Sequence, residues 1–298
     1  MRRNFTWTEH QLDKLNKVND TLAELAEYKP LTLRQIYYQL VGKGYIENKV
    51  SEYTMLSGLL KHARLENLIS WDDIEDRVRT YHNLTGWEDT EHFKRQELRN
   101  FLKGYRRDLM QSQDSYIEIW IEKDALSSIF TKVAAPFTVP VVVCKGFSSI
   151  SFLNDYKERL GEYEDKNSVL LYFGDFDPSG VEMLKAMETT LQDELNVTGI
   201  EFKKIALLKD DIQQYKLPHS PEALKKTDPR SKNYVAEYGE LAVELDALRP
   251  DILEKKIRDS IYNEIDEEAI SMELETQNQE FDILNKLKRK IENLEITE

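Results

Sequence analysis

Two stretches of sequence decide the expected fold, YIEIWIEKDAL at residues 116–126 and SVLLYFGDFDPSG at residues 168–180. Each contains a short apolar run rich in β-branched and aromatic residues, which is typical of a buried strand. The first run ends at Glu122, and the second is followed by Asp175 and Asp177. Open α/β sheets bind their ligands at the carboxyl ends of the strands. We therefore expect these three carboxylates to meet at that edge of a sheet.

The three carboxylates predict a magnesium site. Carboxylate oxygens are the ligands that Mg²⁺ prefers, and protein-bound Mg²⁺ usually shares its shell with phosphate groups. Asp175 and Asp177 are two residues apart, so on an extended strand both side chains would leave the same face. We expect Glu122, Asp175 and Asp177 to hold Mg²⁺ that acts on phosphate chemistry. The five histidines are scattered without ligand spacing, so no zinc site is expected.

Strands and helices alternate from Tyr116 onward, which predicts right-handed βαβ crossovers and a mostly parallel sheet flanked by helices. The expected strands are 117–121, 138–144, 168–173 and 200–208, and the expected helices are 124–134, 148–160 and 178–195. The chain from Lys209 to Asn233 is expected to be irregular. Charged helices are expected over 234–248, over 250–265 and onward to Leu294.

The first 110 residues follow a different pattern. Apolar residues recur at helical spacing in three segments, which are 8–27, 31–44 and 51–67. Thr32 and Ser51 are suited to cap the second and third of these helices. A short strand–turn unit at 68–80 follows, and 88–110 predicts a connecting helix rich in Arg and Lys. Three helices and a small β element predict a winged helix-turn-helix domain.

The predicted organisation has three parts, with boundaries at 1–110, 111–215 and 216–298. The net charge of −14 is unevenly distributed, with 18 Lys and Arg against 17 Asp and Glu in residues 1–110, and 23 against 38 in the rest. Only the N-terminal part is therefore suited to approach a polyanion without metal ions. The single cysteine, Cys144, excludes an internal disulfide framework and indicates a reducing cytosol. No apolar stretch approaches the ~18 residues of a membrane span, and no signal peptide is expected.

Three motifs, IEKDA (Glu122), VCKGFSS (Lys145) and GDFDPSG (Asp175 and Asp177), resemble in their order and spacing the Toprim fold of topoisomerases, primases and some nucleases. Upstream, TLRQIYYQL resembles the winged-helix segment that carries the DNA-cleaving tyrosine in the A subunit of topoisomerase VI and in the meiotic double-strand-break transesterase. The resemblance covers roughly residues 30–250 and extends less specifically to VELDAL at 243–248. It implies a winged helix, then a Toprim domain, then a helical C-terminal extension.

The resemblance also implies roles for individual residues. It makes Tyr38 the nucleophile, Arg34 the arginine that assists it, and Glu122 a metal ligand or general acid/base. It further implies DNA as the partner, a homodimer in which the tyrosine of one chain works with the metal site of the other, and a cytoplasmic location at the nucleoid. The chain is similar to compact stand-alone proteins of this kind and has no P-loop, so ATP-driven strand passage would need a separate B-type ATPase subunit.

Four cations are candidate DNA contacts. Lys123 and Lys145 flank the carboxylates, whereas Lys61 and Arg64 lie on the helix expected to be the recognition helix. Two other functions remain open for the same residues. A hydrolytic Toprim nuclease would use metal-activated water and leave Tyr38 structural. A non-catalytic DNA-binding scaffold would tolerate loss of Asp175.

Overall fold

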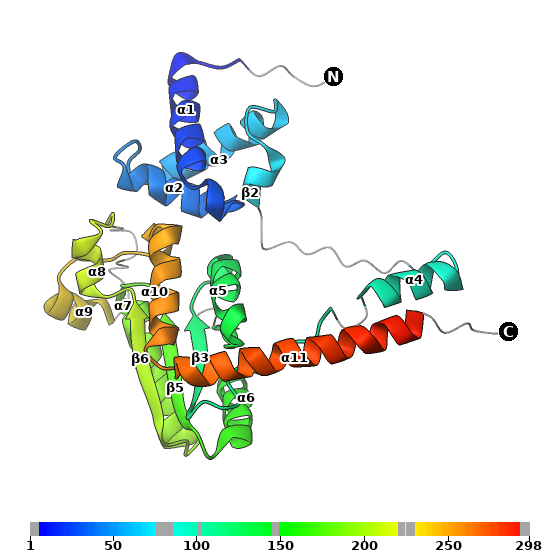
Figure 1. Ribbon diagram of the computed structural model, residues 1–298. Helices are drawn as coiled ribbons and strands as arrows, with labels where there is room; N and C mark the ends of the chain where they lie inside the picture. Colours follow the sequence, from blue (N-terminus) through cyan, green and yellow to red (C-terminus); the bar gives the residue numbers. More distant parts are fainter. Residues whose placement is uncertain are drawn as a thin grey trace.

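A computed structural model describes residues 6–75, 86–100, 103–144, 149–219, 224 and 230–292. It contains an N-terminal helical unit, an α/β unit built on a four-stranded parallel sheet, and a long C-terminal helix (Figure 1). The expected fold class is confirmed at this level: the sheet is parallel, helices flank it, and the C-terminus is helical.

The sheet has the strand order β4-β3-β5-β6, and every neighbouring pair is parallel. Its strands are β3 (Ser115–Ile121), β4 (Val141–Val143), β5 (Asn167–Phe173) and β6 (Ile200–Ala206). Ile121 pairs with both Val143 and Phe173, so the central strands end at the same level. This register puts the residues that follow β3 and β5 side by side at the carboxyl edge of the sheet.

Helices cover both faces of the sheet. Odd-numbered residues of β3 and β5 share a core with α5 (Ser127–Ala134) and α10 (Pro250–Tyr262), which pack on each other. Even-numbered residues share a second core with α6 (Ile150–Leu160) and α7 (Pro178–Thr189). Burial on both faces explains why these strands read as nearly continuous apolar runs.

Glu118 of β3 is a buried charge on the second face. Its carboxylate accepts hydrogen bonds from Tyr116 Oη (2.6 Å), Trp120 Nε1 (2.7 Å) and the guanidinium of Arg159 (2.7 and 3.0 Å). Both oxygens are therefore satisfied, which is how a protein interior normally accommodates an ionised group. We assign Glu118 a structural role.

The N-terminal unit contains three helices and a two-residue parallel strand pair, with the elements α1 (Glu9–Glu24), β1 (Leu31–Thr32), α2 (Leu33–Gly42), α3 (Val50–Leu65) and β2 (Ile74–Glu75). Thr32 caps α2 as expected, because its Oγ1 accepts from Gln35 N (3.2 Å) and Gln35 Oε1 accepts from Thr32 N (2.8 Å). The cap assigned to Ser51 is wrong, since α3 already begins at Val50. The residues that would continue a wing, 76–85, lie outside the described residues.

Three other expected elements differ from the structure. The helix predicted over 88–110 corresponds to α4 (Thr90–Asn100), and the described residues 103–110 are not helical. The stretch expected to be irregular contains α8 (Lys209–Gln214) and the start of α9 (Arg230–Tyr238). The helix predicted over 234–248 ends at Tyr238 because Gly239 adopts φ +73°, a left-handed conformation that favours glycine and stops a helix.

Shorter turns complete the chain. Among the described residues, the 3₁₀-helices are η1 (Ala26–Tyr28), η2 (Trp71–Asp73), η3 (Asp124–Leu126), η4 (Ala135–Phe137), η5 (Gly161–Tyr163) and η8 (Leu245–Ala247), and η6 (Thr190–Glu194) is a π-helix. Extended chain precedes η8, where Val243 pairs with Phe176 in an antiparallel bridge. The VELDAL segment is therefore not an α-helix, and it lies against the GDFDPSG loop.

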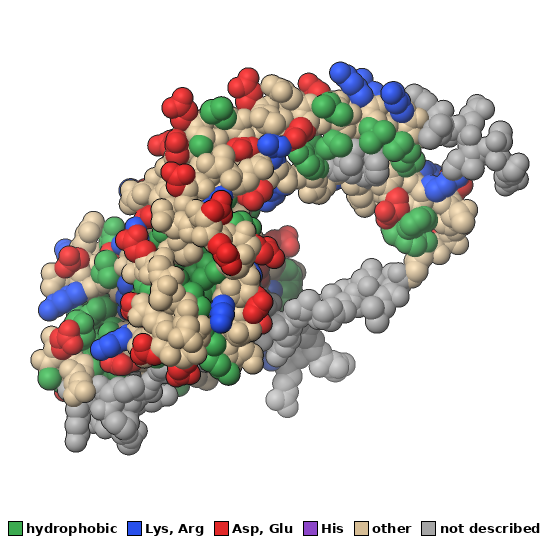
Figure 2. All heavy atoms as spheres, turned by 90° about the horizontal axis from the view of Figure 1, so that it is seen from below, with side chains coloured by type: hydrophobic (Ala, Val, Ile, Leu, Met, Phe, Trp, Pro, Cys, Tyr) green, Lys and Arg blue, Asp and Glu red, His purple; other side chains and the backbone are tan. Residues whose placement is uncertain are grey.

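The last helix, α11 (Glu267–Glu292), extends away from the sheet (Figure 1). Arg107 attaches it to the α/β unit through ion pairs with Glu273 (2.5 Å) and Glu280 (2.7 Å). Acidic side chains lie along the part nearest the sheet, and Lys and Arg side chains lie at its far end (Figure 2). No helix in the described ranges is long and apolar enough to span a membrane.

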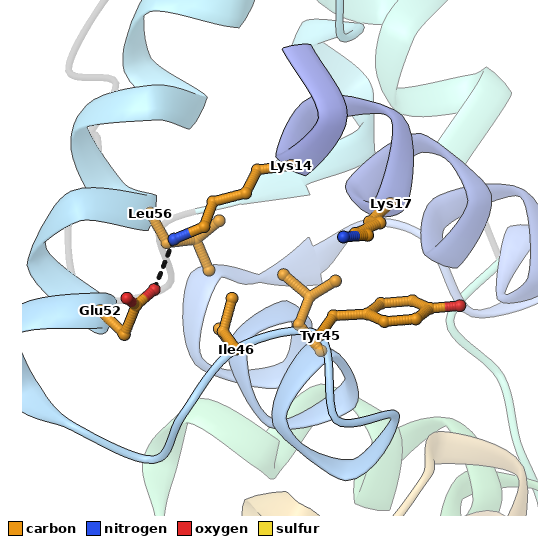
Figure 3. Close-up of a pocket in the computed structure, with 7 residues that line it drawn as sticks. Lys14, Lys17, Tyr45, Ile46, Glu52 and Leu56 are labelled. Carbon is orange, nitrogen blue, oxygen red and sulfur yellow. Dashed lines mark hydrogen bonds and ion pairs between the residues drawn. The ribbon is translucent and has the colours of Figure 1, made fainter. Parts of the chain in front are cut away.

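A small pocket between α1, α2 and α3 is shown in Figure 3. Lys14 Nζ pairs with Glu52 Oε2 at 2.6 Å across it, and Lys17 lies over the ring of Tyr45. Its volume of about 10 Å³ leaves room for one water at most. We therefore assign this pocket to helix packing and not to a ligand.

Candidate active site

Glu122 and Asp175 meet at the carboxyl edge of the sheet. Glu122 follows β3 directly, and its Oε2 accepts a hydrogen bond from the backbone N–H of Asp175 (2.9 Å). Asp177 lies two residues further on, at the N-cap of α7, where its Oδ1 accepts from Gly180 N (2.6 Å). The structure thus gathers the three predicted carboxylates. Because β5 ends at Phe173, as the predicted strand 168–173 does, both aspartates follow the strand, and the shared face expected of an extended strand does not apply to them.

The loop that carries the aspartates is tight. A Cβ atom on Gly180 would lie 2.4 Å from the backbone oxygen of Asp175, so only glycine fits there without a shift. Pro178 occupies the first helical position of α7, where its fixed φ suits the helix and its missing N–H is not needed. These two residues and the cap by Asp177 fix the path of the loop.

The electrostatics of the edge follow from crowding of negative charge. Burial, with the charge of Asp175 adding to it, raises the pKa of Glu122 to about 7. Burial likewise raises the pKa of Asp177, and Asp175 contributes again. Carboxylates that raise the pKa of one another share a poorly solvated region, where a bound cation would be strongly favoured.

Lys123 supplies positive charge at this edge. Its Nζ lies 2.9 Å from Asp175 Oδ1, 2.8 Å from Glu244 Oε2 and 2.9 Å from Asp246 Oδ2. Burial alone would lower the pKa of Lys123, but Asp246 and Asp175 outweigh burial and raise it above its ordinary value. Lys123 is therefore a charged ammonium that is enclosed by carboxylates, and its contact with a phosphate stays a prediction.

Glu244 and Asp246 are site residues that the sequence reasoning missed. They belong to VELDAL, which the backbone bridge at Val243 and a hydrogen bond from Leu245 N to Asp175 Oδ1 (2.8 Å) hold against the aspartate loop. One signal was present in the sequence: acidic residues alternate with Val243 and Leu245, and that period of two favours an extended segment over a helix.

Lys204 of β6 was also missed. Its Nζ donates to the backbone oxygen of Asp175 (3.1 Å). Burial lowers the pKa of Lys204 to about 8, although the nearby carboxylates, Glu122 foremost, oppose this shift. The sequence could not show that Lys204 belongs to the site, because a lysine in a predicted strand is unremarkable and its position depends on which strand β6 pairs with.

The helical unit reaches the same edge through Arg34 of α2. The Arg34 guanidinium forms an ion pair with Glu244, and its Nε lies 3.4 Å from Asp246 Oδ2. It also lies over the ring of Tyr38, 5.8 Å from the ring centroid. Tyr38 is itself only 4% exposed and packs edge-on against Tyr37. Within one chain, contacts therefore run from Tyr38 through Arg34 to the carboxylates.

Three predicted cations converge on one pocket. Arg34, Lys61 and Arg64 line a space of about 470 Å³ between the helical unit and Ala125 of the α/β unit. Arg64 is held in place by Trp71, whose ring centroid lies 4.4 Å from the guanidinium carbon. The prediction for Lys145 falls outside the described residues.

The donor set fits Mg²⁺ in its chemistry, because it consists of carboxylates whose raised pKa values a cation would relieve. Neither oxygen of the buried Asp246 carboxylate has a hydrogen-bond partner, although Oδ2 forms an ion pair with Lys123. In the side-chain conformations of this structure, however, no group of three or more His, Cys, Asp or Glu in the described ranges has the geometry to coordinate a metal ion. Lys123 and backbone N–H groups hold the oxygens that a metal would take.

Comparison with known proteins adds no assignment. No family model matches the chain, and no curated protein matches it either. What can be concluded about this edge rests on its residues and contacts: five carboxylates and three cations, Arg34, Lys123 and Lys204, meet where the parallel strands end.

Proposed function

We propose that this protein cleaves DNA in an Mg²⁺-dependent reaction, with Tyr38 as the nucleophile that forms a 5′-phosphotyrosyl link. The observation that carries the proposal is the contact of Arg34 with Glu244 and Asp246. It joins the helix that bears Tyr38 to the carboxylate edge of the sheet. The order of the motifs, which resembles the A subunit of topoisomerase VI, supports the same reaction.

In the proposed step, Tyr38 Oη attacks the phosphorus. Tyr38 Oη gives up its proton to a base and forms the P–Oη bond, the P–O3′ bond breaks, and its electron pair leaves with O3′, which takes up a proton from an acid. Tyrosine has an ordinary pKa near 10, so its phenolate needs help at neutral pH. Arg34 lies over the Tyr38 ring and can stabilise the negative charge there or on the phosphate.

Glu122 is suited to handle the proton. Its pKa of about 7 lets the carboxyl group give or take a proton near neutral pH, which is what a general acid/base requires. Asp175 and Asp177 would hold Mg²⁺, with Glu122 as a third ligand where it does not act as the acid/base, and the metal would supply charge compensation on the phosphoryl oxygens. Lys204, which donates to the backbone oxygen of Asp175, adds positive charge that positions the loop.

The pocket that contains Arg34, Lys61 and Arg64 offers a path for the DNA backbone. Lysine and arginine contacts to phosphate provide affinity without sequence preference and weaken as salt rises. This pocket borders the edge of the sheet through Ala125. We propose that DNA enters along it, which agrees with a location at the nucleoid.

The test is a cleavage reaction on supercoiled plasmid with Mg²⁺, followed by detection of protein attached to the 5′ ends. Tyr38→Phe should abolish the covalent link while the far-ultraviolet circular dichroism stays unchanged. Tyr37→Phe is the matched control, because the Tyr37 hydroxyl donates to Asn48 Oδ1 (3.0 Å) in its own unit. A link that persists in Tyr38→Phe would remove Tyr38 as the nucleophile.

A second candidate is hydrolysis of DNA by metal-activated water, with Tyr38 as a core residue. The burial of Tyr38 favours it, since an attacking hydroxyl must reach the phosphate and only 4% of this residue is exposed. Hydrolysis predicts free 5′-phosphate or 3′-hydroxyl ends without attached protein. Cutting that survives in Tyr38→Phe and is lost in Asp175→Asn would establish this second reaction.

We also propose a homodimer, because two centres are needed to cut both strands. On α11, residues 267–282 hold acidic and no basic residues, and four of the five charges in 283–292 are basic. Two such helices would be complementary in antiparallel orientation, and Met272, Ile283 and Leu287 are exposed on them. Strand passage driven by ATP would still require a separate ATPase subunit.

A further inference from the structure

The ammonium of Lys123 is surrounded by carboxylates from two segments that are far apart in sequence. Asp175 follows β5, whereas Glu244 and Asp246 belong to the VELDAL segment. Each contributes one oxygen at 2.8 to 2.9 Å from Nζ. The contact with Glu244 Oε2 is a hydrogen bond, and those with Asp175 and Asp246 are ion pairs. Lys123 thus occupies the centre of a three-oxygen shell.

Asp246 carries the second observation. It is 1% exposed, and neither of its oxygens has a hydrogen-bond partner, although Oδ2 lies 2.9 Å from Lys123 Nζ and 3.4 Å from Arg34 Nε. Glu118 shows how the same protein treats a buried carboxylate that has a purely structural role: four hydrogen bonds satisfy both of its oxygens. A buried carboxylate oxygen left without a donor, beside two further carboxylates, is suited to bind a cation.

We propose that Asp175, Glu244 and Asp246 form a second cation site, which Lys123 fills in the metal-free protein and which takes a hard divalent cation when the ammonium leaves. Ca²⁺ binds carboxylate oxygens at about 2.3–2.6 Å and Mg²⁺ at about 2.0–2.1 Å. The three oxygens would therefore have to move inward by less than about 1 Å. The second site shares Asp175 with the proposed Mg²⁺ site, and this inference rests on the proposed function in the choice of cation.

Exchange of the ammonium for a metal ion would have a second effect. It would free Lys123, which follows the proposed catalytic residue Glu122 directly, to contact a DNA phosphate. Lys123 would then have two states. It is enclosed by carboxylates in the structure, and it would contact phosphate, as the sequence predicts, once a metal ion replaces it.

The experiment compares thermal unfolding of wild type and Lys123→Met, each with EDTA, MgCl₂ or CaCl₂. Methionine approximates the length of the side chain and removes its charge. Without metal, Lys123→Met should unfold at a lower temperature, because Arg34 is then the one cation among the described residues that still pairs with any of the three carboxylates. Saturating metal should raise its midpoint by at least about 5 °C more than it raises that of wild type. Lys203→Met is the matched control, because Lys203 pairs with Glu201 and Glu264 outside the site.

The double variant Lys123→Met/Asp246→Asn should lose the extra metal-dependent gain. The proposal would be overturned if the double variant kept the extra rise in midpoint. It would also be overturned if metal raised the midpoint of Lys123→Met no more than that of wild type, or if Lys123→Met stayed unfolded at saturating metal. In a separate measurement, the Mn²⁺ that remains bound is counted by electron paramagnetic resonance. Wild type should bind one more ion than Asp246→Asn, and equal counts would also overturn the proposal.

Glu122→Gln separates this site from the proposed catalytic one. If the second site exists, the variant Glu122→Gln/Lys123→Met should keep the gain in midpoint, since Glu122 contributes no oxygen to the three around Lys123 Nζ. Absence of DNA cleavage by the wild type together with a retained gain would locate the failure in the proposed function alone. Loss of the gain in this variant would mean that the metal binds at Glu122, and the second site would be rejected.

Discussion

Replacing Glu122 by glutamine should change how the stability of the metal-free protein depends on pH. The pKa of Glu122 is about 7 in the folded chain, against an ordinary value of 4.5. Between these two pH values the folded chain binds more protons than the unfolded chain, so the free energy of unfolding falls as pH rises. The shift corresponds to about 3 kcal/mol once Glu122 is fully ionised. The glutamine side chain would remain neutral and still accept the hydrogen bond from Asp175 N.

The measurement is urea unfolding in EDTA at pH 4.5, 6, 7 and 8, for wild type, Glu122→Gln and the exposed control Glu97→Gln. We expect Glu122→Gln to match wild type at pH 4.5 and to exceed it by about 2–3 kcal/mol at pH 8. Adding Mg²⁺ should narrow that difference at pH 8, because a cation beside the carboxylate offsets the cost of its charge. Parallel pH curves for wild type and Glu122→Gln would refute the view that Glu122 is a crowded, buried acid.

Two further predictions concern neighbours of Glu122. Gly180→Ala should destabilise the fold by about 1–3 kcal/mol and lower DNA cleavage several-fold, because the added Cβ would lie 2.4 Å from the backbone oxygen of Asp175. Gly161→Ala is the control in urea unfolding and in the cleavage assay, because a Cβ there has no atom within 4 Å. Lys204 has a pKa of about 8 in the folded chain, below its ordinary 10.5, so the unfolded chain binds more protons between these values. Stability should rise with pH by about 3 kcal/mol across that window, and Lys204→Met should flatten the rise in urea unfolding; an unchanged slope would show that Lys204 is not buried as a charge.

The strands of the sheet were predictable because local sequence determines them. The apolar runs before Glu122 and Asp175 are buried on both faces, and such runs are recognisable without knowledge of the tertiary structure. The cap at Thr32 was predictable for a similar reason, since Gln35 lies three residues away and completes a capping box. The site carboxylates follow from the strands, because parallel strands with aligned ends must bring them together.

The remainder of the site depends on contacts between distant segments. Helical periodicity favoured a helix through residues 234–248, but Gly239 ended it and the bridge to Phe176 placed Glu244 and Asp246 at the edge. Nothing local to Lys123 shows that three acids enclose it, because two of them lie more than a hundred residues away. Lys204 depends in the same way on the pairing of β6 with β5.

The ion pairs of Arg34 bear on how two chains could share a centre. Arg34 contacts Glu244 and Asp246 of its own chain, whereas the resemblance implies that the tyrosine of one chain serves its partner. Domain swapping would reconcile these arrangements. If two chains exchanged their N-terminal helical units, each unit would make with the neighbouring chain the contacts that it loses within its own chain. The energies of the closed monomer and the swapped dimer would then differ mainly through linker strain and lost translational freedom, so protein concentration would select between them.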